Sequence, residues 1–293
     1  RLYGIDAGRI VCGAGSDELL GLLTRAYAGP GDEVLYSRHG FLMYPIAAKS
    51  VGATPVAAAE RDLRADVDAL LAAVTPRTRV VFLANPNNPT GSHLTPSEVE
   101  RLHAGLPADV LLVIDAAYAE YIARDDYDSG LGLVDRAANV VVTRTFSKIY
   151  ALGSVRLGWA YCPAAVADVL NRLRGPFNVS SAAQVVGLAA LEDQDFVARS
   201  RAHNDAWREW TRQELARLGL KVHPSVANFL LVSFAGAAGH NDPAEAARQF
   251  LKGRGILVRQ MGAYGLPDCL RITIGTEEEM REVVSALSDF LKA

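Results

Sequence analysis

Short apolar runs alternate with capped helical segments through the first two thirds of this chain, and that alternation limits its fold more than any other feature. Four runs, each rich in Val and Leu and bounded by Gly, Pro, Asp or Asn, cover residues 31–37, 77–85, 109–116 and 139–145. Near-continuous apolar runs of this length are typical of strands buried on both faces of a parallel sheet. The sequence therefore predicts an α/β fold whose large domain has a mostly parallel sheet flanked by helices.

The starts of several helices can be identified from their capping residues. Thr95 is followed by a proline and, at the third helical position, by Glu98, which is the pattern of a capping box. Residues 242–253 repeat the arrangement with Asp242, Pro243 and Glu245, and residues 275–280 repeat it without the proline, with Thr276 and Glu279. Each of these segments is predicted to begin a helix.

The pattern changes after about residue 195. A long charged helical stretch is followed by three short strand candidates at 226–234, 255–261 and 270–275, with a helix between the first two and another at the end. We therefore expect a large domain over residues 1–195 and a smaller C-terminal α+β domain over 196–293. Because the sequence starts with Arg1 and not Met, we also expect that an N-terminal arm precedes it.

Composition excludes several classes of function. The 293 residues carry 30 basic and 33 acidic side chains, a net charge of −3, which argues against a nucleic-acid-binding surface. No apolar run is long enough to span a membrane and no signal peptide opens the sequence. Three widely spaced cysteines indicate reduced thiols in a cytoplasmic protein, and six scattered histidines without ligand spacing predict no metal site.

Polar residues follow three of the predicted strands, in "NPNNPTG" (85–91), "DAAY" (115–118) and "TFSK" (145–148). In open α/β sheets, ligands bind beyond the carboxyl ends of the strands. Taken singly, these residues are also explained as a turn, a helix cap or a surface lysine, so it is their convergence on one edge that predicts a site. Only five of the 30 cationic residues are lysines, which makes Lys148 a candidate for chemistry that needs a primary amine.

A fourth segment, "CGAGSDELL" (12–20), has the composition of an anion site. Gly13 and Gly15 allow close backbone approach, and Ser16 and Asp17 open a predicted helix whose free N–H groups favour an anion. Arg156, between apolar residues in "SVRLGW", has a fork geometry that suits a phosphate. The alternatives are an ordinary helix cap for the first segment and a buried ion pair for Arg156.

Together these motifs closely resemble the fold type I pyridoxal-phosphate-dependent aminotransferases, and within them the histidinol-phosphate aminotransferase group. The matching sequence segments are spread over nearly the whole chain: "GSDELL", "NPNNPTG", "DAAY", "TFSK", "RLGW", "VANFLL", "GILVR" and "LRITIGT". The resemblance implies pyridoxal 5′-phosphate as cofactor, a homodimer, and a small-molecule amino donor with a 2-oxo acid as acceptor.

The resemblance also implies roles for individual residues around the cofactor ring. Lys148 would join the cofactor aldehyde through its amine and then move a proton between the substrate Cα and C4′ of the cofactor. Asp115 would pair with the ring nitrogen, and Asn88 and Tyr118 would bind the ring 3′ oxygen. Phe41 would stack on the ring face, unless it is an ordinary core phenylalanine.

The cofactor phosphate and the substrate would be held by further groups. The resemblance assigns the phosphate to the backbone amides of Ser16 and Asp17 and to Thr145, Ser147 and Arg156. For the substrate it assigns Arg271 to the glutamate carboxylate or, in the other half-reaction, to the histidinol phosphate group. Arg259 would be a second phosphate contact or a rim salt bridge, and Asn178 would line the pocket.

Two departures from the family pattern matter. Many members have Asp-Glu-Ala-Tyr where this chain has Asp115-Ala116-Ala117-Tyr118, but the missing glutamate is not expected to touch the cofactor. In the family, the N-terminal arm helps to form the dimer and supplies a tyrosine to the neighbouring subunit's cofactor phosphate. A chain that began at Arg1 would be expected to hold the cofactor more weakly.

The motifs specify the cofactor more sharply than the substrate. The leading prediction is transamination between L-histidinol phosphate or imidazole acetol phosphate and L-glutamate or 2-oxoglutarate, a step of histidine biosynthesis. Transamination of aromatic amino acids or prephenate is the nearest alternative. Decarboxylation or C–S cleavage on the same fold, and a non-catalytic binding domain, are further alternatives.

Overall fold

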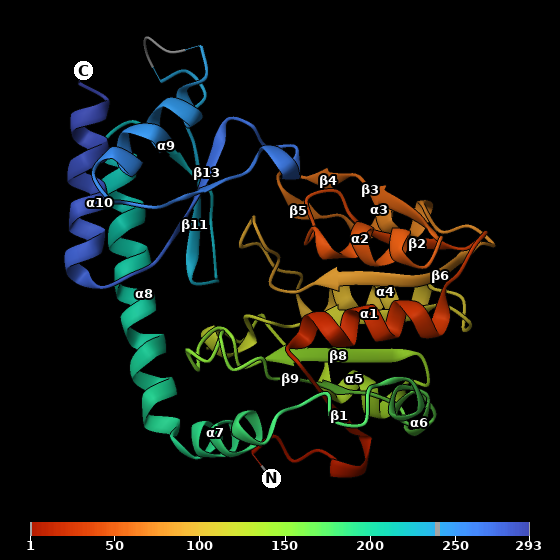
Figure 1. Cartoon of the computed structure of the whole chain (residues 1–293). Coiled ribbons are helices and arrows are strands. Elements are labelled where there is room, and N and C mark those ends of the chain that lie inside the picture. Colours follow the sequence, from red (N-terminus) through yellow and green to blue (C-terminus); the bar gives the residue numbers. More distant parts are fainter. Residues whose placement is uncertain (1, 238–240, 293) are drawn as a thin grey trace.

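A seven-stranded, mostly parallel sheet forms the centre of the large domain in the computed structural model, which describes residues 2–237 and 241–292 (Figure 1). The strand order is β1-β9-β8-β7-β6-β2-β3, in which the five strands from β8 to β3 are parallel and β9 runs antiparallel to both of its neighbours. The strands are β1 (Ile10–Gly13), β2 (Glu33–Ser37), β3 (Thr54–Ala58), β6 (Thr78–Ala84), β7 (Leu111–Asp115), β8 (Val140–Thr145) and β9 (Gly158–Tyr161).

Helices cover both faces of this sheet, and the alternation of strand side chains decides which core each residue joins. On one face, Phe82 and Val113 pack with apolar side chains of three helices, α1 (Ser16–Tyr27), α2 (Met43–Ser50) and α6 (Ala164–Leu173). On the opposite face, Leu83 and Ile114 pack with apolar side chains of α3 (Val67–Ala72), α4 (Pro96–Gly105) and α5 (Leu131–Arg136). All residues of β7 and β8 are buried, as strands covered on both faces should be.

The C-terminal part forms a second, smaller sheet with its own core. Each strand of this sheet is antiparallel to its neighbours. Their order is β10 (Lys221–Val222), β11 (Phe229–Ser233), β13 (Cys269–Thr273) and β12 (Arg259–Gln260). Side chains of α8 (Gln194–Arg217), α9 (Pro243–Gly253) and α10 (Glu277–Phe290) pack against it.

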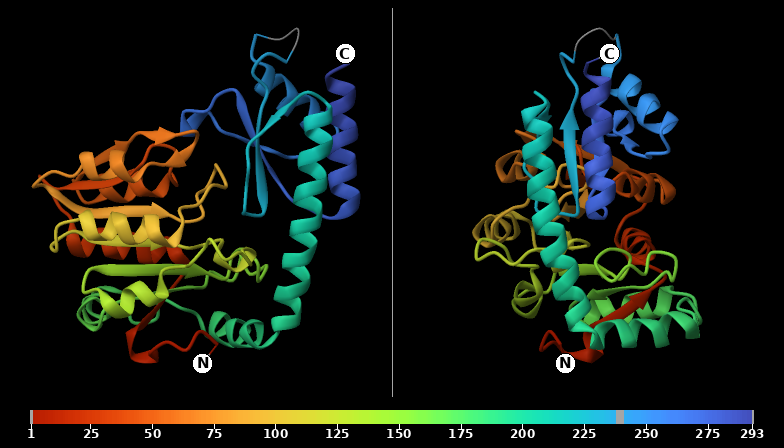
Figure 2. Two further views of the ribbon diagram at one scale, coloured as in Figure 1. Left: turned by 180° about the vertical axis from the view of Figure 1, so that it is seen from behind. Right: turned by 90° about the vertical axis from the view of Figure 1, so that its left-hand side faces the viewer.

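Helix α8 runs from the large domain to the small one, next to α7 (Ser181–Glu192) at its start (Figure 2). Its Val197 belongs to the core of the large domain and its Leu215 to that of the small domain. The predicted domain boundary between residues 195 and 196 falls in the first turn of this helix and stays a prediction.

The predicted α/β architecture is confirmed. The four predicted strands are β2, β6, β7 and β8, and the capping boxes predicted at Thr95 and Thr276 are formed. Asp242 caps α9 as predicted, but the predicted return bond from Glu245 is absent, because its carboxylate binds Arg248 instead. Strands β3 and β9 were not predicted, since β3 contains a proline and two alanines and β9 is only four residues long. In the described part of the chain, none of the helices has the length and apolar character needed to cross a membrane.

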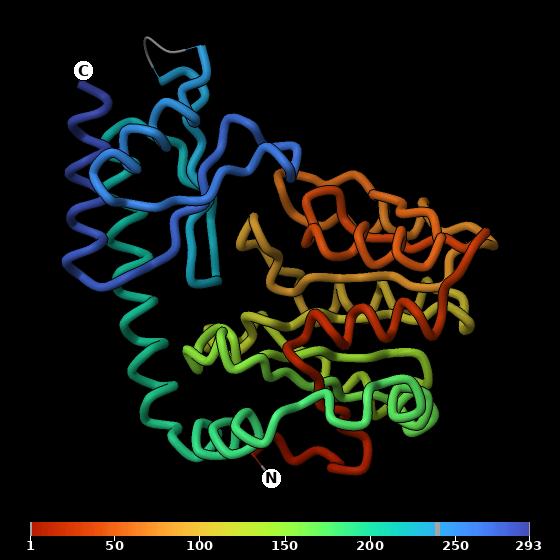
Figure 3. The backbone as a smooth tube through the Cα atoms, in the orientation of Figure 1, coloured from red at the N-terminus to blue at the C-terminus, as the bar shows by residue number. Residues whose placement is uncertain are grey.

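The carboxyl ends of β6, β7 and β8 lie at one edge of the large sheet. The arrowheads of β6 and β8 point toward the small domain in Figure 1, and the backbone trace in Figure 3 shows the loops that follow them in the space between the two sheets. The fold therefore brings the ends of three strands, the start of α1 and part of the small sheet toward one place.

Candidate active site

One cavity of about 320 Å³ collects twelve of the thirteen residues that the sequence singled out. It lies beyond the carboxyl ends of β6, β7 and β8 and is closed on one side by two arginines of the small sheet. The predicted residues in its lining are Ser16, Asp17, Phe41, Asn88, Asp115, Tyr118, Thr145, Ser147, Lys148, Arg156, Arg259 and Arg271.

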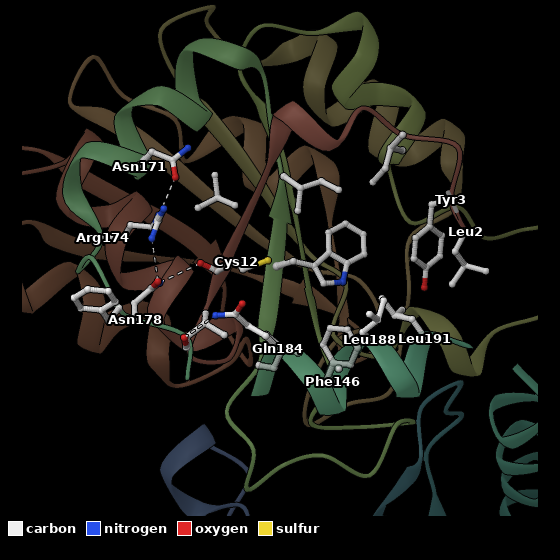
Figure 4. A pocket seen from close by; sticks show the side chains of 18 of the residues that line it. Leu2, Tyr3, Cys12, Phe146, Asn171, Arg174, Asn178, Gln184, Leu188 and Leu191 are labelled. Atoms are coloured by element: carbon white, nitrogen blue, oxygen red, sulfur yellow. Dashed lines mark hydrogen bonds between the residues drawn. The ribbon is translucent and has the colours of Figure 1, made fainter. Parts of the chain in front are cut away.

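Asn178 is the exception, and the prediction that it lines the same pocket is corrected. Its amide nitrogen donates to the Cys12 carbonyl at 3.1 Å and to Glu18 Oε2 at 3.0 Å. These contacts place it beside a second, larger cavity of about 610 Å³, whose lining includes Leu2, Tyr3 and Leu188 (Figure 4). That cavity is predominantly apolar and brings no group of charges together, so the smaller, charged cavity is the candidate active site.

Asp115, the last residue of β7, places a carboxylate at the floor of the cavity. It is 5% exposed, and burial raises its pKa to about 6. The Tyr44 hydroxyl donates a hydrogen bond to Oδ2 at 2.9 Å, and the Thr143 hydroxyl donates to Oδ1 at 3.3 Å. Both bonds lower the pKa and so act against burial.

Lys148 lies three residues after the end of β8 and is half-buried. Its Nζ is 5.3 Å from the centroid of the Tyr118 ring. Burial, followed by the charge of Arg271, lowers the pKa of this amine, whereas the charge of Asp115 acts in the opposite direction. A larger fraction of the amine is therefore uncharged at neutral pH than for an exposed lysine, which is what a nucleophile or a general base requires.

The start of α1 has the structure of an anion site. Its N-cap residue is Gly15, with φ of +86°, and no side chain caps the helix, so the first backbone N–H groups face the cavity. A Cβ at Gly15 would lie 2.3 Å from Nη2 of Arg156, and one at Gly158 would lie 2.4 Å from the Ser16 nitrogen. Glycine at both positions is thus required for the close approach of these groups.

Arg156 and two hydroxyl groups complete this anion site. The guanidinium donates from Nη1 to the Gly153 carbonyl at 2.9 Å and to Ser147 Oγ at 3.4 Å. The Thr145 hydroxyl donates to Ser147 Oγ at 3.0 Å. Asp17 Oδ2 lies 3.8 Å from Arg156 Nη2, a long and partly exposed ion pair that leaves the guanidinium available to a stronger anion.

The residues present fit pyridoxal phosphate. An uncapped helix start with an arginine and hydroxyl groups suits its phosphate, and a buried carboxylate suits its cationic ring nitrogen. In the same cavity, Lys148 provides an amine whose pKa is lowered. The buried Asn88 and Tyr118 provide polar groups that suit its ring oxygen. No group of three or more His, Cys, Asp or Glu that could bind a metal ion occurs in residues 2–237 and 241–292.

Sequence reasoning missed Tyr44, which does not line the cavity but contacts Asp115 from behind. It follows Phe41 by three residues, a spacing that places both side chains on one face of a helical turn. That spacing was the available signal, although it does not indicate which polar group the hydroxyl binds.

Comparison with known proteins gives the same result as the geometry. A model of the family described as "Aminotransferase class I and II" matches residues 1–287. Histidinol-phosphate aminotransferase of Rhodospirillum centenum is 66% identical over 290 residues, which are 99% of this chain and 79% of the relative. The enzyme of that name from Paramagnetospirillum magneticum is 64% identical over 99% of this chain and 80% of its own length.

A solved structure is similar over the entire chain. It is the histidinol-phosphate aminotransferase of Sinorhizobium meliloti in complex with pyridoxal-5′-phosphate, which superposes with a TM-score of 0.91 at 30% identity and covers 100% of this chain and 79% of that one. The family match and the identities of 57–66% with three curated relatives confirm the resemblance, and with it the fold class. The chain belongs to the class I and II aminotransferases.

Proposed function

We propose that this chain is a pyridoxal-phosphate-dependent transaminase that exchanges an amino group between L-glutamate and imidazole acetol phosphate, giving 2-oxoglutarate and L-histidinol phosphate. The observation that carries the substrate is the identity of 66% over 99% of the chain with a protein named histidinol-phosphate aminotransferase. The reaction is a step of histidine biosynthesis, and we propose a cytoplasmic location for it.

The geometry of the cavity supports the following assignment of the cofactor residues. Bound pyridoxal phosphate would supply an aldehyde that accepts the amino group and a ring that withdraws electrons from the substrate. We assign Lys148 to hold that aldehyde and to move the proton at the substrate Cα, because its lowered pKa favours the uncharged base. Asp115 would keep the ring nitrogen protonated, and Asn88 with Tyr118 would bind the ring oxygen.

The remaining lining residues would orient the cofactor and the substrate. The cofactor phosphate would be held by the backbone amides of Ser16 and Asp17 and by the side chains of Thr145, Ser147 and Arg156. Phe41 would lie against the face of the cofactor ring. Arg271 and Arg259, from β13 and β12, would bind the carboxylate of glutamate or the phosphate of the other substrate. A pair of arginines suits both anions, which is what a transaminase with two unlike substrates needs.

Spectroscopy of the cofactor-loaded protein tests this proposal. A visible absorbance band should form with pyridoxal phosphate and should bleach when L-histidinol phosphate or L-glutamate is added. Lys148→Ala should abolish the band, while Lys49→Ala, which changes an exposed lysine of α2, should leave it intact. Bleaching by aromatic amino acids but not by L-histidinol phosphate would overturn the substrate assignment and favour the aromatic alternative.

We further propose that the active form is a homodimer, with α7 at the interface. Phe177 and Leu188 line the apolar cavity and are 92% and 62% exposed, and Val185 of α7 is 71% exposed. Exposed apolar side chains gathered in this way favour a protein contact. Light scattering of Leu188→Asp should give a monomer, and Ile46→Asp, which changes another exposed apolar residue, should stay dimeric. A monomeric parent protein would contradict this part of the proposal.

A further inference from the structure

Tyr44 is fixed in an aromatic stack beneath the cavity. It is 1% exposed, and its ring lies parallel to that of Phe82 in β6, with centroids 4.7 Å apart and 5° between the planes. It also makes a T-shaped contact with the ring of Phe41, which lines the cavity, with centroids 5.9 Å apart and 90° between the planes. A phenylalanine would make both ring contacts equally well, so packing alone does not explain the hydroxyl group.

The hydroxyl of Tyr44 points to the one carboxylate at the floor of the cavity. Because side chains alternate along a strand, Asp115 projects to the same face of the sheet as Val113, and this is the face that α2 covers. Thr143 is the residue paired with Asp115 on the neighbouring strand β8. The carboxylate thus receives one hydroxyl from the helix, at 2.9 Å, and one from the strand, at 3.3 Å.

We propose that Tyr44 is a positioning residue for the transamination, whose hydroxyl fixes Oδ2 of Asp115 and keeps that carboxylate negatively charged and turned toward the cofactor ring nitrogen. The inference rests on the proposed function, because it is the cofactor ring nitrogen that requires the charge. A neutral donor suits this task better than a lysine or arginine would, since it stabilises the carboxylate without neutralising the charge that the ring nitrogen needs.

The balance of forces at Asp115 shows why the hydroxyl matters. Burial favours the uncharged acid, and the charge of Asp17 acts in the same direction, whereas Tyr44, Thr143 and the charge of Lys148 favour the carboxylate. Burial and the nearby Asp115 raise the pKa of Tyr44 well above its ordinary value, so Tyr44 keeps its proton and remains a donor at every pH at which the enzyme would work. Loss of its hydroxyl removes the shorter of the two hydrogen bonds.

The test compares Tyr44→Phe with Tyr36→Phe. Tyr36 lies beside Tyr44, with ring centroids 6.2 Å apart, and does not line the cavity, so it is a control for the loss of a neighbouring, partly buried phenol hydroxyl. The first measurement is the titration of Asp115 in the cofactor-free protein, followed by carbon NMR of labelled aspartate carboxyls and assigned with Asp115→Asn. Tyr44→Phe should move this titration to higher pH, and Tyr36→Phe should not move it.

The second measurement separates positioning from substrate binding. In the loaded enzyme, Tyr44→Phe should lower kcat by about tenfold or more while the KM values change little, because a hydrogen bond to a charged group is lost and the substrate contacts are kept. The kcat deficit should widen as the pH falls toward the titration of Asp115. An unchanged Asp115 titration together with an unchanged kcat would overturn the inference.

The outcomes for the two proposals are distinguishable. If the parent protein forms no band with pyridoxal phosphate, the proposed function fails, while the NMR titration still decides whether Tyr44 controls Asp115. If Tyr44→Phe does not fold, 3-fluorotyrosine incorporated at position 44 takes its place. As a stronger donor it should move the Asp115 titration to lower pH, and no movement would contradict the inference.

Discussion

The guanidinium of Arg271 donates a hydrogen bond from Nη1 to Oδ1 of Asn88, joining the small sheet to the loop after β6 across the cavity. The same guanidinium lies 4.9 Å from the ring centroid of Phe229. Its Nε is buried and has no hydrogen-bond partner among the described residues. Arg271 is therefore held in place by one neutral amide and an aromatic ring, and no carboxylate of residues 2–237 and 241–292 forms an ion pair with it that would compete with an incoming anion.

We expect Arg271→Lys to weaken substrate binding without affecting the cofactor. A lysine keeps the charge but loses the planar fork that binds a carboxylate through two parallel hydrogen bonds. The KM for L-glutamate should rise by roughly ten- to a hundredfold, which corresponds to about 1.4–2.8 kcal/mol. Steady-state kinetics with varied L-glutamate, and an absorbance titration with pyridoxal phosphate, measure the two effects. Arg281→Lys, an exposed arginine of α10, is the control, and an equal KM in both variants would contradict the role of Arg271.

Gly15→Ala should disrupt the anion site at the start of α1. The added Cβ would lie 2.3 Å from Arg156 Nη2, and the φ of +86° is unfavourable for any residue with a Cβ. The displaced guanidinium should weaken binding of pyridoxal phosphate by about ten- to a hundredfold, as expected for the loss of a charge-assisted hydrogen bond. Fluorescence or absorbance titration of the cofactor-free protein gives the dissociation constant.

Gly21→Ala is the matched control on the same helix. A Cβ there meets no atom within 4 Å, and alanine favours the helical conformation over glycine. This variant should bind the cofactor like the parent and should be more stable by about 0.5–1 kcal/mol. If both alanine variants bound the cofactor equally well, the close approach at Gly15 would not serve phosphate binding.

The sequence predicts the site better than it predicts the interactions that support it. Lys148, Asp115 and Asn88 follow strands that can be recognised by composition, and the rule that parallel strands end at one edge brings them together. Asn178 was misplaced because its position depends on hydrogen bonds to Cys12 and Glu18, 166 and 160 residues earlier, which no local pattern specifies. Tyr44 was missed because its spacing from Phe41 does not indicate that its hydroxyl binds a carboxylate 71 residues away.

A buried ion pair behind the site was missed for the same reason. Arg144 of β8 donates to Glu120 Oε1 at 2.8 Å, and their side chains are 4% and 6% exposed. Arg144 is the one charged residue of β8, and the sequence does not show that its partner lies 24 residues earlier. The guanidinium also stacks on Tyr3 and Trp159, at 4.9 and 5.5 Å from their ring centroids, so that it joins the first residues of the chain to the large sheet.

Glu120→Ala should therefore destabilise the fold strongly. It leaves the guanidinium of Arg144 buried without its carboxylate, which costs about 3–5 kcal/mol in comparable cases. Glu100→Ala is the control, because Glu100 pairs with Arg136 at 2.8 Å with side chains more than half exposed, and such a pair contributes only about 0–1 kcal/mol. Urea unfolding at pH 7.5, followed by circular dichroism, measures both. Equal losses of unfolding free energy would show that burial does not govern these pairs.

Asp115→Asn should raise the stability of the cofactor-free protein and abolish its transaminase activity. Burial raises the pKa of Asp115 from 3.8 to about 6, so the cofactor-free folded state binds the proton more tightly than the unfolded chain does. The resulting penalty is absent below about pH 4, grows as the pH rises toward 6 and is complete above it, where it amounts to about 3 kcal/mol. Asparagine removes the charge and can still accept a hydrogen bond from Tyr44. The cofactor-free variant should therefore be more stable than the parent by about 2–3 kcal/mol at pH 8 and equally stable near pH 4.

The same substitution should abolish transamination, because a neutral amide does not keep the cofactor ring nitrogen protonated. Urea unfolding of the cofactor-free proteins at pH 8, 6 and 4.5 and the rate of the half-reaction with L-glutamate measure the two effects together. Asp268→Asn, an exposed carboxylate in the loop before β13, should change neither. If Asp115→Asn lowered the unfolding free energy by the same amount at all three pH values, the buried charge would not oppose folding. Asp115 would then be a residue that stabilises the fold. It would not be a carboxylate that stays charged, at a cost in stability, to bind the cofactor ring nitrogen.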